Sequence, residues 1–275
     1  MNKLNFLSSG IPLSTSKKGL IEGLNQVKKL DLDGMELEFV HGIYLKKEKT
    51  PEIKKFVKEN NLIISSHSPY YVNLNAQDKQ KWHASISYIV QSAKITYLCN
   101  GYSVCFHPAF NMKNTKEEVY KKVKDAIELI LKELKKDDVE IWIRPETAGK
   151  ISQFGNINEI IRLSEEFENV LPCIDFSHLH AYTNGKYNTL NEFREVLALI
   201  EKKLGRNALD DVHFHCQGIN YNEKGEKNHL NLKDSDLNYK DLIKTWKEFK
   251  LKGIVVCESP NVEKDALLLK EIYNN

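Results

Sequence analysis

The stretch Leu171-Pro172-Cys173-Ile174-Asp175-Phe176-Ser177-His178 decides the fold. It is an apolar run that ends in a carboxylate, with an imidazole three residues later. Seven other apolar runs end in the same manner, with a metal-binding or hydrogen-bonding side chain just after the last apolar residue. When such runs are parallel strands of one barrel, their carboxyl ends meet at one face. The recurrence therefore predicts that these polar side chains form a single site.

The apolar runs alternate with segments of helical period, which is the pattern of repeated strand-helix units. Strands are expected at residues 4–7, 34–39, 62–67, 103–108, 139–143, 171–176, 212–216 and 253–258. Helices are expected at about 18–30, from near Pro51, at 82–98 and at about 115–135. The last of these opens with Thr115 and Glu118, which can form a capping box.

This alternation predicts an α/β protein whose eight strands form a single-domain (β/α)8 TIM barrel over residues 1–275. No Pro-, Gly- or Ser-rich linker divides the chain. A doubly wound open sheet is the structural alternative. It lacks support because no G-x-G-x-x-G follows the first strand and no G-x-x-x-x-G-K-[ST] occurs.

The composition is that of a globular protein, with 41% hydrophobic and 28% charged residues. The formal net charge of +2 allows a nucleic-acid partner without arguing for one. The five cysteines are odd in number and show no Cys-x-x-Cys spacing, which is typical of reduced thiols. No signal segment and no apolar run long enough to cross a membrane is seen. We expect a cytoplasmic, soluble monomer that does not contact a membrane.

The strand ends supply a set of imidazoles and carboxylates: His67, His107, Glu146, Asp175 with His178, His213 or His215, and Glu258. A set without thiolate suits Zn²⁺, Mn²⁺ or Fe²⁺. Six or more ligands exceed the need of one ion, so a cluster of two or three ions is expected. His229, in the polar segment 225–229 that is expected to be a loop, offers a further ligand.

Each of these residues also has an ordinary structural interpretation. A single strand histidine is more often a hydrogen-bonded core or surface residue than a ligand. Asp175 could serve only to cap the helix that follows it. The joint pattern favours a metal site, because burying several unpaired carboxylates and imidazoles together costs several kcal/mol unless a cation compensates them.

At these residues the chain resembles endonuclease IV, the metal-dependent apurinic/apyrimidinic endonuclease family within the xylose-isomerase-like TIM barrels. The seventh strand, with its histidines, and His229 match the family, as do five further segments in the family's order. These are His67-Ser68-Pro69-Tyr70-Tyr71-Val72-Asn73-Leu74, Phe106-His107-Pro108, Glu146-Thr147-Ala148-Gly149, Cys173-Ile174-Asp175-Phe176-Ser177-His178 and Glu258-Ser259-Pro260.

The resemblance implies a trinuclear zinc site, with Mn²⁺ or Fe²⁺ possible in part of it. His67, His107 and Glu146 would bind the first ion, and Glu146 would bridge to a second ion held by Asp175, His215 and Glu258. His178 and His229 would hold the third ion with a carboxylate of the same segment. Such a cluster generates hydroxide near neutral pH and stabilises both oxygens of an in-line displacement. Glu146 would also orient the attacking hydroxide and serve as the catalytic residue.

The family cleaves damaged double-stranded DNA on the 5′ side of an abasic site and leaves a 3′-hydroxyl and a 5′-deoxyribose phosphate. The damaged nucleotide is flipped out of the stack, which is easier where no base is present. Tyr70 matches a family tyrosine that is wedged into the resulting gap. By itself, Tyr70 is as readily interpreted as a packed aromatic at the barrel rim.

The chain departs from the family at several positions. Lys227 stands where the family has an Asp two residues before the loop histidine, so either Glu226 or Lys227 occupies the position of that carboxylate. The segment after Glu146 is one residue shorter than in the family. His213 and His215 point to the same strand face, and His215 is the favoured ligand. The loop after Phe39 lacks the family's intercalating arginine pattern.

Two other functions compete with a DNA-repair nuclease. A metal-dependent sugar or sugar-phosphate isomerase or epimerase uses the same barrel with one or two ions, but a mononuclear site would leave His67, His107 and His229 without roles. A non-catalytic metal or nucleic-acid binder would need a basic recognition element, and nothing in the sequence resembles a basic recognition helix. The ligand constellation therefore favours the nuclease.

Overall fold

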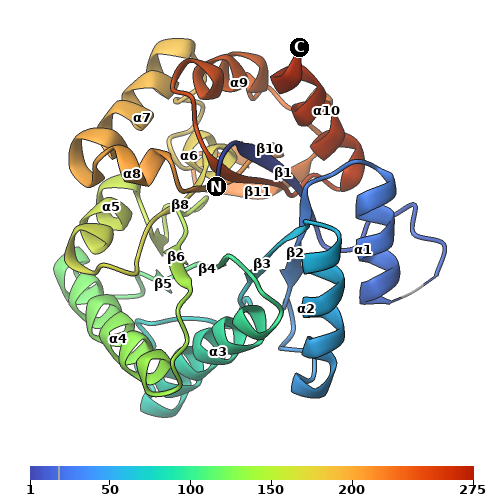
Figure 1. The fold of residues 1–275 in the computed structure, drawn as a ribbon. Helices are drawn as coiled ribbons and strands as arrows, with labels where there is room; N and C mark the ends of the chain where they lie inside the picture. The colour runs from blue at the N-terminus through green and yellow to red at the C-terminus, as the bar shows by residue number, and fades with distance from the viewer. Residues whose placement is uncertain (18) are drawn as a thin grey trace.

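Eight parallel strands form one sheet that curves around a central axis (Figure 1). The computed structural model describes residues 1–17 and 19–275. The strands are β1 Leu4–Ser9, β2 Gly34–Glu38, β3 Ile63–His67, β4 Ser103–Phe106, β6 Trp142–Pro145, β8 Cys173–Asp175, β9 Val212–His215 and β12 Gly253–Cys257. They are paired in the order β6-β4-β3-β2-β1-β12-β9-β8. Two parallel bridges, Ile143 to Val170 and Glu146 to Cys173, join the ends of this order. The predicted TIM barrel is confirmed.

Helices form the outer ring of the barrel (Figure 1). They are α1 Leu20–Lys29, α2 Thr50–Glu59, α3 Lys79–Leu98, α4 Lys116–Lys136, α5 Ile157–Glu166, α7 Leu190–Leu204, α8 Arg206–Leu209, α9 Tyr239–Glu248 and α10 Glu263–Asn274. Shorter pieces are the helix α6 Phe176–Tyr182 and the 3₁₀ turns η1 Lys47–Lys49 and η2 Leu232–Asp234. Within the described residues, no helix combines the length and the hydrophobicity needed to span a bilayer.

Local sequence signals explain where two helices begin. Thr115 caps α4: its hydroxyl accepts from the Glu118 backbone N–H, and the Glu118 carboxylate accepts from the Thr115 N–H at 2.7 Å. The predicted capping box is confirmed. Pro51 lies in the first turn of α2, where its missing N–H removes no helical bond. The predicted start of α1 at Lys18 lies outside the described residues, and α1 begins at Leu20.

Several predicted strand boundaries are shifted, two of them for local reasons. The fifth strand, expected at 139–143, spans Trp142–Pro145, because residues 137–139 form the turn that ends α4. Asp138 has a φ of 51° and the Val139 N–H donates to the Leu134 carbonyl at 3.1 Å, which is a Schellman ending. The sixth strand ends at Asp175 rather than at Phe176, because the Asp175 carboxylate caps α6 by accepting from the His178 N–H at 2.7 Å.

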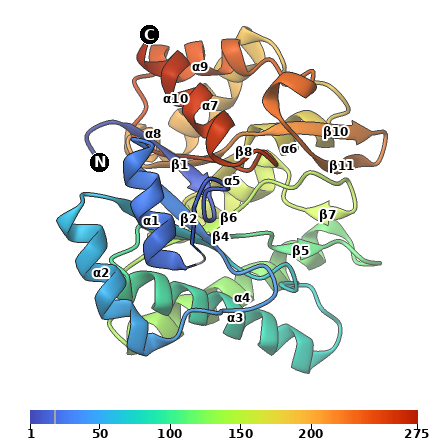
Figure 2. The same cartoon turned by 90° about the vertical axis from the view of Figure 1, so that its right-hand side faces the viewer.

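Two small antiparallel sheets stand on one side of the barrel (Figure 2). The first pairs β5 Ala109–Phe110 with β7 Gln153–Phe154. The second is a hairpin of β10 Gly218–Asn222 and β11 Gly225–Leu230. Residues 225–229, expected to be a loop, are therefore a strand. Its backbone is anchored to the barrel because the Glu226 N–H donates to the Gly149 carbonyl at 2.8 Å.

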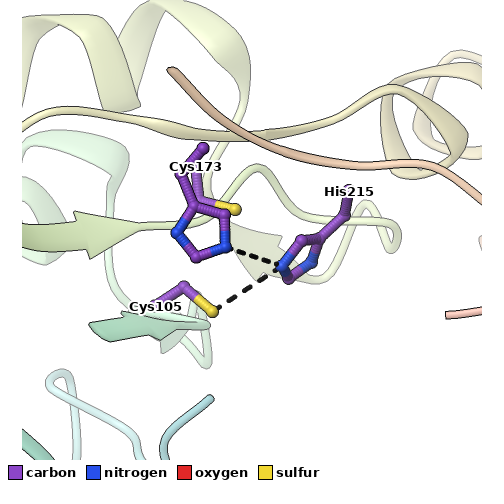
Figure 3. A group of neighbouring side chains, drawn as sticks. Cys105, Cys173 and His215 are labelled. Carbon is purple, nitrogen blue, oxygen red and sulfur yellow. Dashed lines mark hydrogen bonds between the residues drawn. The ribbon is translucent and has the colours of Figure 1, made fainter. Parts of the chain in front are cut away.

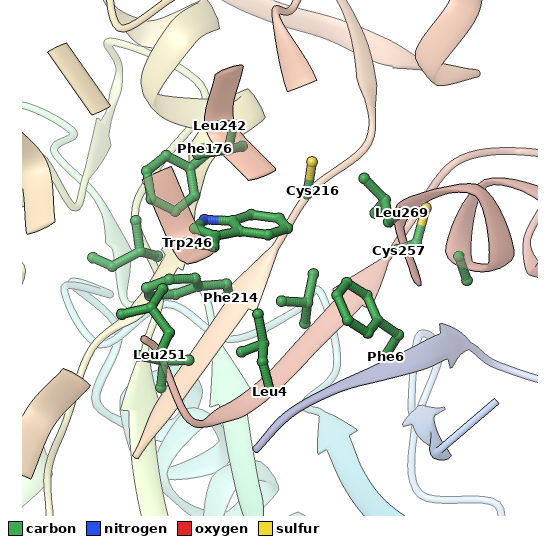
Figure 4. Close-up of a cluster of buried hydrophobic side chains, with 14 of the residues drawn as sticks. Leu4, Phe6, Phe176, Phe214, Cys216, Leu242, Trp246, Leu251, Cys257 and Leu269 are labelled. Atoms are coloured by element: carbon green, nitrogen blue, oxygen red, sulfur yellow. The ribbon is translucent and has the colours of Figure 1, made fainter. Parts of the chain in front are cut away.

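The large apolar clusters lie between the strands and the helices. In one of them, the Trp246 indole of α9 packs against Phe176 and Phe214, with ring centroids 6.2 and 6.3 Å away, and these two rings lie 5.1 Å from each other (Figure 4). A third, small cluster contains Leu7, Ile254 and Val256. Most TIM barrels fill their interior with bulky branched side chains. Here contacts that cross the interior are made by polar groups, as between Glu36 of β2 and His213 of β9, which lie 3.1 Å apart.

Replacing Trp246 by Ala is expected to lower the free energy of unfolding by about 3–5 kcal/mol, because the substitution removes the largest fully buried side chain and leaves a cavity. Urea denaturation measures this change. Trp246→Phe should cost much less, since the indole N–H has no hydrogen-bond partner among the described residues. Equal costs for the two variants would show that the indole is not packed as described.

Candidate metal centre

The predicted ligands meet at the carboxyl ends of the barrel strands. His67 and His215 are the last residues of β3 and β9, and Asp175 is the last residue of β8. Glu146 and Glu258 directly follow β6 and β12, and His107 follows β4. In a parallel barrel these ends form one mouth, so residues distant in sequence converge there.

The Glu146 carboxylate is the centre of the group. One oxygen, Oε2, lies 3.1 Å from His67 Nε2 and 3.6 Å from His107 Nε2. The other, Oε1, lies 3.2 Å from both His178 Nδ1 and His215 Nδ1. Each oxygen thus faces two imidazoles from different elements. This is the position from which one carboxylate can bridge two cations.

A second set of donors surrounds Oε1 of Glu146. Asp175 Oδ2 lies 3.1 Å from His178 Nδ1, and Glu258 Oε2 lies 3.5 Å from His215 Nδ1. Asp175 has two roles, because Oδ1 caps α6 while Oδ2 faces the cluster. Asp175 therefore caps the helix that follows it and, with its other oxygen, faces the His178 ring in the cluster. Glu146, Asp175, His215 and Glu258 place one donor atom each within 4.8 Å of one another.

A third set is formed by His178, Glu226 and His229. The two oxygens of Glu226 lie 3.6 Å from His178 Nε2 and 3.6 Å from His229 Nε2. Glu226, and not Lys227, occupies the place of a carboxylate between the two imidazoles, and Lys227 is exposed.

A β-bulge explains how Glu226 reaches this place. Tyr221 pairs with Glu226 and Asn220 pairs with Asn228, so Lys227 has no partner across the hairpin. In a regular strand, residues two apart share a face. The extra residue of a bulge shifts this alternation by one and re-aims the side chains. Glu226 and His229, three residues apart, therefore point to the same side.

The electrostatics of the group fit a cation. Burial and the nearby carboxylates of Glu146 and Glu38 raise the pKa of Glu258 well above its usual range. Burial opposes ionisation of Glu146, but His107 and His215 hold its pKa well below the usual range. His178 Nε2 and His107 Nδ1 are buried without a hydrogen-bond partner among the described residues. Several buried carboxylates beside unpartnered imidazole nitrogens are the donor set that divalent zinc, manganese or iron accepts.

A cavity of about 380 Å³ opens above these residues. Its wall combines ligand candidates with Tyr70, Phe110, Lys150 and Gln153. Tyr70 is 56% exposed, and its ring lies 5.7 Å from that of His67. The small sheets described above supply Phe110, Gln153, Glu226 and His229 to this wall.

The two histidines of β9 have different surroundings. His215 presents Nδ1 to Glu146 and Glu258, as expected for the favoured ligand. His213 lies deeper, 3.1 Å from Glu36 and 2.9 Å from Ser103 Oγ.

Four residues close to the centre were not predicted. Glu36 lies 3.0 Å from His215 Nε2, and Gln217 donates to Asp175 Oδ2 at 2.7 Å. Cys105 and Cys173 gather beside His215 (Figure 3). Glu36 could have been found from the alternation in Gly34-Met35-Glu36-Leu37-Glu38, which puts two carboxylates on one strand face. The thiols gave no such signal, since both lie inside apolar runs.

Comparison with known proteins adds to this geometry. Residues 24–272 match the family described as xylose isomerase-like TIM barrel. The chain belongs to this family. It is 41% identical over 271 residues to the uncharacterized protein MJ0133 of Methanocaldococcus jannaschii, with 98% of this chain and 97% of that protein covered. A probable endonuclease 4 of Halothermothrix orenii is 24% identical over 236 residues, covering 78% of this chain and 84% of that protein.

Solved structures of the xylose isomerase-like fold include both enzyme classes considered above. Endonuclease IV from Thermus thermophilus superposes with a TM-score of 0.72 and 18% identity, covering 97% of each chain. A D-tagatose 3-epimerase-like protein superposes with a TM-score of 0.75 and 17% identity, covering 98% of this chain and 96% of that one. At these identities the likeness is one of fold, so the activity must be argued from the site.

Glu226→Gln is expected to lower the metal content by about one ion per chain, because it removes the charged partner of His178 and His229. Atomic emission spectrometry after dialysis measures the bound metal. Lys227→Gln is the matched control: its side chain is exposed on the other side of the bulge, so its metal content should stay at the wild-type value. The opposite result, loss only in the Lys227 variant, would contradict the assignment.

Proposed function

We propose that this member of the xylose isomerase-like family is a zinc-dependent phosphodiesterase. Its substrate would be duplex DNA that carries an abasic site, cut on the 5′ side to leave a 3′-hydroxyl and a 5′-deoxyribose phosphate. The observation that carries the proposal is that three donor groups overlap at shared residues. They are His107, Glu146 and His178; Glu146, Asp175, His215 and Glu258; and His178, Glu226 and His229.

The overlap of the three donor groups suits the hydrolysis of a phosphodiester, in which an attacking oxygen displaces a leaving oxygen at phosphorus. Ions held in these groups would supply a nucleophile from water near neutral pH and stabilise the charge on the leaving oxygen. Glu146 lies where two groups meet, so its carboxylate can orient the attacking water and take up its proton. Gln217 holds Asp175 in place by donating to Oδ2, which fixes one wall of the site.

The rim of the cavity is suited to a disrupted DNA stack. Tyr70 and Phe110 present aromatic rings that are 56% and 40% exposed. Lys150 lines the same cavity and offers a cation to a phosphate. An abasic nucleotide has no base to unpair, so it can leave the duplex at low cost while an aromatic ring fills the gap.

Sugar epimerisation is the alternative activity in this barrel. A typical mononuclear site needs only the donors around Glu146, Asp175, His215 and Glu258. The additional imidazoles favour the nuclease. His67 and His107 lie on Oε2 of Glu146, the oxygen that faces away from those donors, and His229 faces Glu226, a carboxylate that such a site would not require.

The first test is incision of a duplex oligonucleotide with one stable abasic analogue by protein reconstituted with Zn²⁺ or Mn²⁺. Cleavage 5′ to the lesion is expected, with Glu146→Gln slower by at least about 10²–10⁴-fold because it removes the bridging charge and the proton acceptor. Glu128→Gln, an exposed carboxylate of α4, should retain the wild-type rate. An intact duplex with folded, metal-loaded protein would reject the proposal, and turnover of a ketohexose would replace it with epimerisation.

Tyr70→Ala should weaken binding to the abasic duplex by about 5–150-fold relative to wild type, since one aromatic stacking contact contributes about 1–3 kcal/mol. Fluorescence anisotropy with abasic and undamaged duplexes measures the effect. Tyr97→Ala removes an exposed tyrosine of α3 outside the cavity and should change neither affinity. Equal affinity of wild type and Tyr70→Ala for the lesion would remove Tyr70 from the DNA contact.

A further inference from the structure

A second ring of donor side chains lies beneath the metal centre. On three strands, the residue two positions before a cluster ligand is itself a soft or borderline metal donor: Cys105 precedes His107, Cys173 precedes Asp175, and His213 precedes His215. Because side chains two apart on a strand share a face, these residues point into the same interior, one layer deeper. All three are fully buried.

The donor atoms of this layer converge on one point. Cys105 Sγ, Cys173 Sγ and one ring nitrogen each of His213 and His215 lie within 4.8 Å of one another. His213 Nε2 is 3.2 Å from His215 Nε2, and Cys105 Sγ is 3.8 Å from His215 Nε2 (Figure 3). Tetrahedral zinc, with bonds of about 2.0–2.1 Å to nitrogen and 2.3 Å to sulfur, separates its ligands by about 3.3–3.8 Å. The two distances given above, 3.2 and 3.8 Å, lie close to this range, and the other pairs of donor atoms are within 4.8 Å.

The surroundings orient these donors. Ser103 Oγ lies 2.9 Å from His213 Nδ1, so the hydrogen bond at that nitrogen leaves Nε2 directed at His215 and Glu36. Glu36 approaches the group, with oxygens 3.1 Å from His213 Nε2 and 3.0 Å from His215 Nε2. The Cys105 thiol is 3.7 Å from both Glu36 oxygens, too long for a strong hydrogen bond. The Cys105 thiol can also donate to the Ser66 carbonyl at 3.5 Å, so its proton has a backbone acceptor while its sulfur faces the His215 ring.

We propose that Cys105, Cys173, His213 and His215 bind a structural zinc ion inside the barrel, separate from the cluster at its mouth. Two thiolates and two imidazoles form a closed tetrahedral set with no open position for substrate. Glu36 lies against this set as a neighbouring carboxylate. The site draws its ligands from β4, β8 and β9, so the ion ties strands that are not all neighbours in the sheet.

His215 would belong to both layers. Its Nε2 faces the deep site, and its Nδ1 faces Glu146 and Glu258. An ion on Nε2 fixes the plane of the ring and thereby the direction of Nδ1. The deep ion would thus position a ligand of the upper cluster without contacting substrate.

Cobalt substitution tests the deep site. Two thiolates on one ion distinguish the deep site, because in the group His67, Cys105 and Glu146 a single thiol lies within 4.8 Å of upper-cluster donors. Thiolate-to-cobalt charge-transfer absorption in the near ultraviolet with the intensity of two thiolates therefore reports the deep site. Wild-type protein loaded with Co²⁺ should show this absorption. The double variant Cys105→Ser, Cys173→Ser should lose it and bind about one ion fewer per chain. Cys257→Ser is the matched control, since its hydroxyl can keep the hydrogen bond to Ser259, and it should retain the absorption.

X-ray absorption at the zinc edge tests the same site in unaltered protein, in case the double variant does not fold. Sulfur at about 2.3 Å from zinc is expected. Zinc surrounded by nitrogen and oxygen only, or cobalt-loaded wild type without the sulfur absorption, would overturn the proposal. Neither measurement uses DNA, so failure of incision at abasic sites would leave this result unaffected.

Discussion

The contact of the Glu146 carboxylate with four imidazoles is the constraint on which the rest of the structure depends. A carboxylate removed from water costs several kcal/mol unless positive charge or hydrogen bonds replace the water. Here the replacement comes from β3, the residue after β4, α6 and β9, so the charge is balanced only when the whole barrel has closed. The same geometry makes Glu146 the point where cations can be shared.

The polar interior is possible because the apolar burial is outside the barrel. The two large clusters pack helices against the outer faces of the strands, and only Leu7, Ile254 and Val256 form a buried apolar cluster of their own apart from them, among the residues that the structure describes. The free energy gained by burying apolar side chains is roughly proportional to the apolar area removed from water and does not depend on where in the molecule they are buried. Once the outer layer supplies it, the inner layer can hold carboxylates, imidazoles and thiols. The interior of the barrel is therefore lined by polar and ionisable side chains instead of being filled by an apolar core.

Much of this architecture could be predicted from the sequence because strand ends carry a local signal. An apolar run that stops at His67 or Asp175 marks both the strand and the ligand candidate. What sequence reasoning missed depends on contacts between distant strands. The alternation in residues 34–38 places Glu36 on one face of its strand, but the partner that it meets there, His213, is set by contact between distant strands. The shift of the fifth strand has a local cause: Asp138 adopts a positive φ in the turn that ends α4, so the strand begins only at Trp142.

The bulge at Lys227 has a consequence for how relatives of this chain should be compared. Judged by sequence position alone, the residue two before His229 is a lysine, and the carboxylate one residue earlier would not be expected to face the same way. In space, the bulge shifts the alternation of side chains by one residue and brings Glu226 to the same side as His229. Two chains can therefore present the same kind of side chain to a site from different sequence positions. Where a hairpin supplies a candidate ligand, two sites should be compared by the side chains that face the cavity, and not by sequence position alone.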